Sequence, residues 1–227
     1  FVVLSDLATW NIDGAFLLGV SAGDARELQK MMDIPAVFID TYAEDASLTT
    51  VSIEDRKGGY LAAKYLITQG HTKIGCVYRD DKAGSGKSRL VGYMRALSEH
   101  GILVREEYLK KGDYRMESGY HAAGGLLATD CTAAFICNDM MTLGFLRRLY
   151  EEGCQVPRDY SIVSYDDSLK NYLLGLELTT VVQDIEMLAG EACRLLFGRL
   201  ADGEDAPKSI VLAPKLTVRG SVRFCGI

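Results

Sequence analysis

The chain has 227 residues, of which 48% are hydrophobic and 25% are charged, so it can bury one large core or two smaller ones. Its net charge of −6 and its pI near 5.2 argue against nucleic-acid binding by this portion alone, because phosphate binding needs a concentrated basic surface. No apolar run approaches the roughly 20 residues that span a bilayer, and no signal peptide is recognisable, so we expect no membrane contact. The missing initiator Met suggests a fragment of a longer chain.

Strand-like and helix-like segments alternate along the chain, which predicts parallel sheets covered by helices on both faces. We expect strands at 1–4, 15–19, 36–39, 73–78, 133–137, 161–165, 178–182, 210–212 and 216–218. We expect helices at 24–32, 53–70, 117–128, 140–152 and 187–200, and one more with Leu90, Tyr93, Met94 and Leu97 on one face. The first two strands leave little room for a helix between them, which suggests that residues between Asp6 and Leu7 are absent from this chain.

The sequences of two predicted helices indicate how these helices pack. Gly58 and Gly59 lie inside the helix at 53–70, where glycine costs about 1 kcal/mol relative to alanine, so we expect another backbone to approach closely there. The helix at 187–200 is expected to pack through Leu188, Cys193, Leu196 and Leu200.

The six cysteines show no CxxC motif and no Cys/His metal spacing, and several of them lie inside apolar runs. This pattern favours reduced, mostly buried thiols in a cytoplasmic protein over a disulfide framework. We therefore predict no metal site and no cofactor.

Polar residues follow five of the predicted strands: Asp40, Asp80, Asn138, Asp166 and Gln183. Each of them alone could be an ordinary turn or N-cap residue. In a parallel sheet, however, the carboxyl ends of the strands lie at one edge, where ligands bind in open α/β folds. Carboxylates and amides are suited to hydroxyl groups, so the set predicts a pocket for a polyol or sugar.

Arg89 is a further candidate, because Ser88 is expected to be an N-cap and would place Arg89 at a helix start. The helix dipole disfavours a cation there, and a residue set against local preference is a functional candidate. The alternative is a solvated surface arginine.

No sequence motif of a catalyst is present, since GxSxG and HExxH are absent and no histidine lies near the strand ends. We therefore predict that the chain is not an enzyme. The segment from Lys82 to Ser88 resembles a phosphate-binding P-loop, but Asp81 stands where that motif needs glycine. The alternative to a non-enzyme is therefore a nucleotide hydrolase that uses this segment.

Motifs spread over nearly the whole chain resemble the effector-binding domain of lactose/galactose-repressor-type (LacI/GalR) transcription regulators. They include Ile12-Asp13-Gly14, Gly70-His71-Thr72-Lys73-Ile74, Arg89-x-x-Gly92-Tyr93, Cys137-Asn138-Asp139, Tyr165-Asp166-Asp167, Leu178-Thr179-Thr180-Val181-x-Gln183 and Leu216-x-Val218-Arg219-x-Ser221. The helical segment 55–63, with Gly70-His71-Thr72 and Tyr165-Asp166-Asp167-Ser168, is particularly similar to the arabinose-repressor branch, whose effector is L-arabinose.

The resemblance implies a two-lobed α/β fold of the periplasmic-binding-protein type, in which each lobe is a mainly parallel sheet flanked by helices and three crossovers join the lobes. We expect residues 1–52 and 184–212 in the N-terminal lobe, and residues 53–183 and 213–227 in the C-terminal lobe. By motif, the residues expected to contact a monosaccharide between the lobes are Arg89, Asn138 and Asp166, with Asp40 and Gln183 lining the cleft.

The implied protein is a cytoplasmic, homodimeric transcription regulator that binds DNA through an N-terminal domain outside this chain. The alternative is a secreted solute-binding protein that delivers sugar to a transporter. An upstream DNA-binding module would favour regulation, whereas an upstream signal peptide would favour transport.

Overall fold

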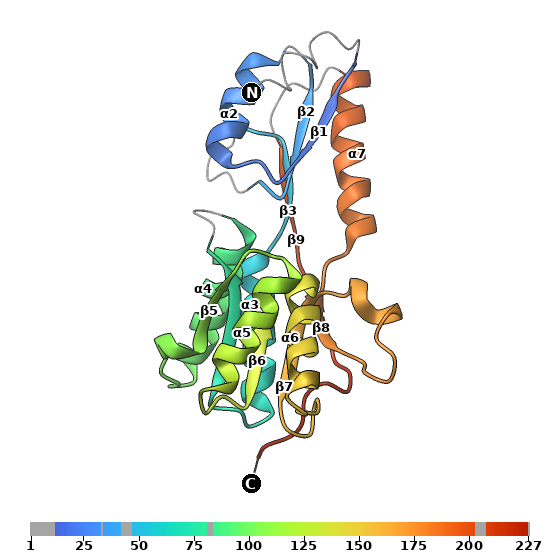
Figure 1. Ribbon diagram of the computed structural model, residues 1–227. Coiled ribbons are helices and arrows are strands. Elements are labelled where there is room, and N and C mark those ends of the chain that lie inside the picture. Colours follow the sequence, from blue (N-terminus) through green and yellow to red (C-terminus); the bar gives the residue numbers. More distant parts are fainter. Residues whose placement is uncertain (1–11, 33, 42–46, 81–83, 203–207, 227) are drawn as a thin grey trace. The chain divides into compact units, whose positions relative to one another are not determined.

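The computed structural model describes residues 12–226 apart from 33, 42–46, 81–83 and 203–207. The expected strand at 1–4 and the junction between Asp6 and Leu7 therefore lie outside the described residues. The chain divides into two compact units, of which unit 1 is Phe1–Ile53 with Asp184–Leu212 and unit 2 is Glu54–Gln183 with Ala213–Ile227. The chain thus passes three times from one unit to the other (Figure 1).

Within the described residues, unit 1 is a four-stranded, wholly parallel sheet in the order β1-β2-β3-β9, with a helix packed on each face. The strands are β1 (Ala15–Leu18), β2 (Ala36–Ile39), β3 (Thr50–Ile53) and β9 (Ser209–Leu212), and the helices are α2 (Ala22–Met31) and α7 (Ile185–Asp202). Helix α2 packs through Ala25 and Leu28 against Phe38, whereas α7 packs through Leu188 and Leu195 with the opposite face. Strands β2 and β3 are buried on both faces, which explains the continuous apolar sequence of β2.

Unit 2 is a six-stranded sheet in the order β10-β8-β7-β6-β4-β5, parallel except for β10, which runs antiparallel to β8. The strands are β4 (Ile74–Arg79), β5 (Leu109–Gly112), β6 (Ala133–Ile136), β7 (Ser161–Asp166), β8 (Thr179–Val182) and β10 (Lys215–Thr217). The helices are α3 (Asp55–Thr68), α4 (Ser85–Glu99), α5 (Met116–Leu127) and α6 (Asp139–Glu151), with the short 3-10 helices η1 (Glu106–Tyr108) and η2 (Ser168–Asn171). Helices α3 and α4 pack together on one face, and α5 and α6 pack together on the other (Figure 1).

Helices α3 and α4 approach each other backbone to backbone at Gly59, as predicted, whereas the close neighbour of Gly58 is the side chain of Tyr165 rather than a backbone. A Cβ atom on Gly59 would overlap the carbonyl oxygen of Arg89, and a Cβ atom on Gly92 would overlap that of Arg56. Glycine is required at such contacts because any side chain would separate the helices. This contact fixes the start of α4 beside the start of α3.

Two strands were not predicted, and three residues lie on another helix face than expected. Strand β3 was partly assigned to the following helix, and β5, with the sequence LKKG, lacks an apolar run. Met94 and Leu200 are 38% and 40% exposed, and Cys193 is also exposed. In α7 the buried stripe is Leu188, Ala192, Leu195 and Leu196, and Cys193 lies one residue, or about 100°, away from it.

All six cysteines are free thiols, and Cys76, Cys131 and Cys137 are buried. Within the described ranges, no group of three or more His, Cys, Asp or Glu side chains is placed to hold a metal ion. None of the helices described for this chain is long and apolar enough to cross a bilayer.

Candidate functional site

Four polar residues lie along one edge of the unit 2 sheet. These residues end a strand or follow it within two residues, at β4, β6, β7 and β8, which are neighbours in that order: Asp80, Asn138, Asp166 and Gln183. The chain also changes direction here, because β5 lies on one side of β4 and β6 lies on the other. In open α/β sheets, the crevice beyond the strand ends at such a switch point is where ligands bind.

Arg89 lies at the centre of this edge, with only 6% of its side chain exposed. Its Nε donates a hydrogen bond of 2.7 Å to Oδ1 of Asp55, and its Nη1 donates one of 2.5 Å to the carbonyl oxygen of Cys137. The guanidinium carbon lies 3.6 Å from the centroid of the Tyr165 ring. The alternative of a solvated surface arginine is therefore wrong.

The expected N-cap at Ser88 is also wrong. Helix α4 begins at Ser85 with Gly84 as its N-cap, so Arg89 lies in the second turn rather than at the start. The P-loop-like segment thus ends inside a helix, and its residues 81–83 lie outside the described residues. The second turn of α4 is where the glycine contact brings the helix against α3, and this contact directs Arg89 inward.

Asp55 holds the buried arginine in its charged form. Asp55 is the first residue of α3, where the helix dipole favours a negative charge. Only 2% of the residue is exposed. It also accepts a hydrogen bond of 2.9 Å from the hydroxyl of Tyr165. Burial alone would lower the pKa of Arg89, but the charges and dipoles of Asp55, Tyr165 and Asp166 raise this pKa well above its usual value. The guanidinium is therefore a permanent cation.

Asp166 is a partly exposed hydrogen-bond acceptor in the cluster. Its Oδ1 lies 3.9 Å from Nη1 of Arg89 and accepts a hydrogen bond of 2.5 Å from Nε2 of Gln183. The Asp166 side chain is 30% exposed. Burial raises the pKa of this carboxyl above its ordinary value, and the charge of Arg89 and the Gln183 hydrogen bond oppose that rise. Arg89, Asp166 and Gln183 are thus brought together.

The backbone around Asp166 is strained and firmly held. Asp166 and Asp167 have φ angles of 99° and 77°, which side-chain-bearing residues adopt at an energetic cost, often at functional sites. Asp167 is fixed by two hydrogen bonds from Arg219, of 2.5 and 2.9 Å. Asp139 is buried and accepts hydrogen bonds from the backbone N–H and hydroxyl of Ser168, both of 2.5 Å. The turn after Asp166 is therefore anchored on two sides.

Asn138 has a local structural role that the sequence alone left open. Its Oδ1 accepts a hydrogen bond of 3.0 Å from the backbone N–H of Met141, which makes it the N-cap of α6. Its Nδ2 donates one of 3.2 Å to the carbonyl oxygen of Tyr114. An amide has two donor hydrogens and two acceptor lone pairs on oxygen, so half of its hydrogen-bonding capacity is left for another partner.

Of the other two strand-end residues, Asp80 does not belong to this cluster and Asp40 belongs to the other unit. Asp80 is 54% exposed and pairs with Lys111 of β5, with an Nζ–Oδ2 distance of 2.6 Å. Asp40 belongs to unit 1, where it follows β2 with a φ angle of 55° and donates its backbone N–H to the carbonyl oxygen of Val51. Asp40 therefore remains a predicted site residue, whereas Asp80 forms an ordinary surface ion pair.

Three residues of the cluster were not predicted as site residues: Asp55, Tyr165 and Tyr114. Tyr114 follows β5 with a φ angle of 68°, and its ring centroid lies 6.0 Å from the Arg89 guanidinium carbon. Its hydroxyl lies 2.9 Å from that of Ser85. Tyr165 lies inside an apolar strand, so its sequence context indicates a core residue rather than a site residue. Acidic residues are common at helix starts, so the position of Asp55 did not indicate a role in the site.

The raised pKa of Asp166 gives a prediction for stability, because the folded chain holds the proton more tightly than the unfolded chain does. The protonated carboxyl therefore stabilises the fold at low pH, and this contribution is lost as the pH rises from about 3.9 through the raised pKa. We expect the wild-type free energy of unfolding to fall, relative to that of Asp166→Asn, across this interval. Urea unfolding of both proteins at a series of pH values measures the difference, and a pH-independent difference would contradict the assignment.

Comparison with known proteins agrees with this architecture. A family model described as a periplasmic binding protein-like domain matches residues 63–222. The HTH-type transcriptional repressor PurR of Mannheimia succiniciproducens is 34% identical over 224 residues, which cover 97% of this chain and 67% of the relative. PurR of Pasteurella multocida is 32% identical over 198 residues, which cover 86% of this chain and 59% of the relative. The chain thus spans between 59% and 67% of the length of these two relatives.

Solved structures are similar over almost the whole chain. The transcriptional regulator CelR in complex with cellobiose superposes with a TM-score of 0.89 at 31% identity, over 97% of this chain and 69% of that one. A LacI family transcriptional regulator from Enterococcus faecium with bound ribose gives a TM-score of 0.88 at 28% identity, over 98% of this chain and 84% of that one.

These comparisons confirm the fold class and the general resemblance, whereas the narrower resemblance to the arabinose-repressor branch is not confirmed. The relatives are transcriptional repressors, and the chain, like them, is not an enzyme. The chain belongs to the periplasmic-binding-protein-like family, as an effector-binding domain of the LacI type.

Proposed function

We propose that the cluster around Arg89 and Asp166 binds hydroxyl groups of a sugar effector. The observation that carries this proposal is the 3.9 Å gap between Nη1 of Arg89 and Oδ1 of Asp166. This distance is within ion-pair range but too long for a hydrogen bond, so a charged donor and a charged acceptor face each other without a direct hydrogen bond. A hydroxyl group both donates and accepts, and one hydroxyl can therefore accept from Arg89 while it donates to Asp166.

The charges of the cluster suit a neutral polyol better than an ion. The guanidinium has five donor hydrogens, of which two are used by Asp55 and Cys137. The adjacent carboxylates of Asp55 and Asp166 would repel an anion, and Arg89 would repel a cation. The sugars bound in two similar structures, cellobiose and ribose, belong to the same chemical class.

The remaining parts of the proposal concern the whole protein. We propose that Asn138 and Gln183 contribute to the same site, and that Asp40 contacts the ligand from unit 1. The effector is a monosaccharide such as L-arabinose, and the protein is a cytoplasmic homodimer whose DNA-binding domain lies outside this chain. The sugar alters DNA binding only to the extent that it binds two arrangements of the units with different affinity.

A thermal-shift panel tests the ligand class. L-Arabinose, D-ribose, other pentoses, hexoses, cellobiose and sugar phosphates are added separately to the purified chain. We expect at least one neutral sugar to raise the midpoint of unfolding in proportion to the logarithm of its concentration, because a ligand that binds only the folded state stabilises it. A response to sugar phosphates alone would correct the ligand class, and the absence of any response would contradict the proposal.

A further inference from the structure

A small cavity lies in unit 2 between strand β8 and the segment that follows Asp166. It has a volume of about 10 Å³, and a cavity that holds one water molecule needs roughly 10–15 Å³. Its lining includes two carboxylates, a guanidinium and a hydroxyl, from Asp139, Asp167, Arg219 and Thr180. This feature, which we call the Thr180 cavity, has room for one small polar molecule but not for a sugar.

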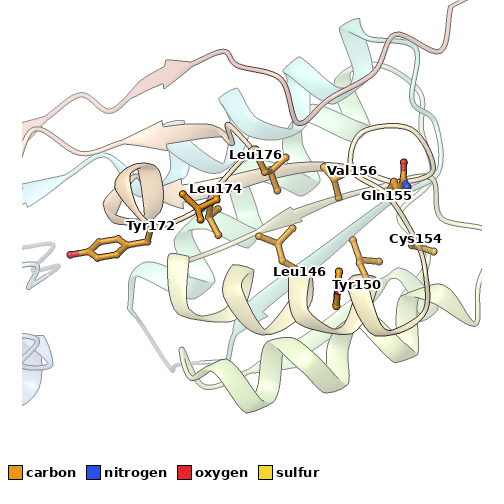
Figure 2. Close-up of a pocket in the computed structure, with 10 residues that line it drawn as sticks. Leu146, Tyr150, Cys154, Gln155, Val156, Tyr172, Leu174 and Leu176 are labelled. Atoms are coloured by element: carbon orange, nitrogen blue, oxygen red, sulfur yellow. The ribbon is translucent and has the colours of Figure 1, made fainter.

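Leucine side chains form another part of the cavity wall. Leu173 and Leu176 line both the Thr180 cavity and a larger hollow of about 530 Å³ beside α6. Figure 2 shows Leu176 facing that larger hollow, across from Leu146 of α6. These leucines offer no hydrogen-bonding group, so a polar atom in the Thr180 cavity must find its partner inside the cavity.

The hydroxyl of Thr180 is the observation that carries the inference. Thr180 is 1% exposed, and its Oγ1 is buried without a hydrogen-bond partner among the described residues. A buried hydroxyl that stays unpaired destabilises a fold, so most such groups bond to protein or to ordered water. We infer that the Thr180 cavity binds one water molecule, which accepts a hydrogen bond from Thr180 and donates to Asp139 and Asp167.

Strand register places Thr180 on the face that carries the first acceptor. Ser164 of β7 is the direct neighbour of Thr180, and its hydroxyl donates a hydrogen bond of 3.2 Å to Oδ1 of Asp139. The side chains of such neighbours lie on one face of a sheet. Oδ2 of Asp139 accepts three hydrogen bonds from Ser168 and Leu169. An ionised carboxylate oxygen has two lone pairs, so Oδ1 can accept one more hydrogen.

Asp167 supplies the second acceptor. Its two oxygens accept hydrogen bonds of 2.5 and 2.9 Å from Arg219. Each of these oxygens therefore has a lone pair left. A water that accepts from Thr180 and donates to Asp139 and Asp167 makes three hydrogen bonds, which is the usual number for a buried water.

The charges around the cavity favour a neutral molecule over an ion. The carboxylates of Asp139 and Asp167 are balanced by Arg219 and Lys170, which also line the cavity. An ion would disturb this balance, and in so small a space it would also lose its hydration shell, which is costly. Water is therefore the ligand that fits the cavity in both size and charge.

Through this water, Thr180 is a positioning residue for the backbone that carries Asp166. Asp166 and Asp167 have φ angles of 99° and 77°, and strained backbone of this kind persists only where its surroundings hold it. Asp139 and Arg219 already hold the turn from two sides. The water connects both carboxylates to β8, so it is a third anchor of the same turn.

Thr180→Val tests the inference through the sign of its effect on stability. Valine has nearly the shape of threonine, and both residues favour strands, so the variant changes little besides the hydroxyl. We expect the melting temperature to fall by about 2–4 °C, because the water loses a partner. Removal of an unpaired hydroxyl would instead leave the melting temperature unchanged or raise it, and that result would overturn the inference.

Thr217→Val is the matched control. Thr217 pairs with Thr180 across strands β10 and β8, but it is half-buried and does not line the cavity. We expect its melting temperature to stay close to that of the wild type. A fall as large as that of Thr180→Val would show that loss of any threonine hydroxyl in these strands has the same effect, and it would contradict the inference.

A crystal structure of the wild-type chain shows the water directly. We expect a water oxygen within about 3.2 Å of Oγ1 of Thr180 and of carboxylate oxygens of Asp139 and Asp167. The same water is expected in Thr180→Ser, which keeps the hydroxyl, and its density should be lost in Thr180→Val. A cavity without a water, or a direct hydrogen bond from Thr180 to the protein, would contradict the inference.

Hydrogen exchange tests the positioning role. We expect the backbone amides of Ser168 and Leu169 to exchange severalfold faster in Thr180→Val, and to return toward wild-type rates in Thr180→Ser. Unchanged rates, or equal acceleration throughout unit 2, would rule out a local role for Thr180. These measurements use the protein without a sugar, so they remain decisive even if the sugar panel gives no response.

Discussion

Replacing Asp55 with Ala is expected to lower the free energy of unfolding by about 3–5 kcal/mol, because it leaves the buried guanidinium of Arg89 without its partner. The variant also removes the acceptor of the Tyr165 hydroxyl. Burial of an uncompensated charge is one of the few mechanisms by which a single substitution has so large an effect. Urea unfolding of the purified chain, followed by circular dichroism, measures the change.

Asp80→Ala is the matched control, since Asp80 is an acidic residue at the same sheet edge that pairs with Lys111 in an exposed position. We expect this variant to unfold at nearly the wild-type urea concentration, because exposed ion pairs contribute little. A loss of stability in Asp55→Ala no larger than that in Asp80→Ala would show that the buried pair is not a central contact of unit 2.

Replacing Asp166 with Ala is expected to weaken sugar binding by at least tenfold. A hydrogen bond between a charged group and a hydroxyl contributes about 1.5–3 kcal/mol, and about 1.4 kcal/mol corresponds to a factor of ten. Asp166 gives a clearer test than Arg89, because removal of Arg89 would also leave buried Asp55 unpaired. Isothermal titration calorimetry with the sugar that the thermal-shift panel identifies measures the affinity.

The control for binding is again Asp80→Ala, which changes the charge at the same edge by one unit without touching the cluster. We expect it to bind the sugar with nearly wild-type affinity. Equal affinities of Asp166→Ala and the wild type would remove Asp166 from the site, whereas equal losses in both variants would indicate only a long-range electrostatic effect.

The parts of the structure that could be predicted from the sequence are those set by local pattern. Apolar runs such as AVFI and AAFI mark buried parallel strands, and the polar residues that follow them mark the sheet edge. The sequence therefore placed Asp166 and Gln183 at a common edge, because strand ends in a parallel sheet must meet there. Gly59 indicated the close contact of α3 with another backbone, whereas Gly58 makes room for the Tyr165 side chain.

The parts that could not be predicted depend on packing between distant segments. Tyr165 and Asp55 are hydrogen-bonded although they are 110 residues apart, and no local pattern encodes that pair. The inward direction of Arg89 follows from the helix contact at Gly59 and from a helix start four residues earlier than expected. Asp80 follows the strand-end rule, yet it pairs with a neighbouring lysine at the surface.

The same packing explains why the cluster is suited to binding. Arg89 is held by Asp55 and the Cys137 carbonyl, and the turn after Asp166 is held by Asp139 and Arg219. Groups that are already fixed lose little conformational freedom when a ligand binds, which favours affinity. Asp139 and Arg219 therefore support the site even though neither is predicted to contact the sugar.

The most direct test of the account is a crystal structure of the chain with the sugar that binds most strongly in the panel. We predict a sugar oxygen within about 3.2 Å of both Nη1 of Arg89 and a carboxylate oxygen of Asp166, filling the gap that separates them. A sugar held elsewhere in the protein, with the contacts of Arg89 and Asp166 unchanged, would contradict it.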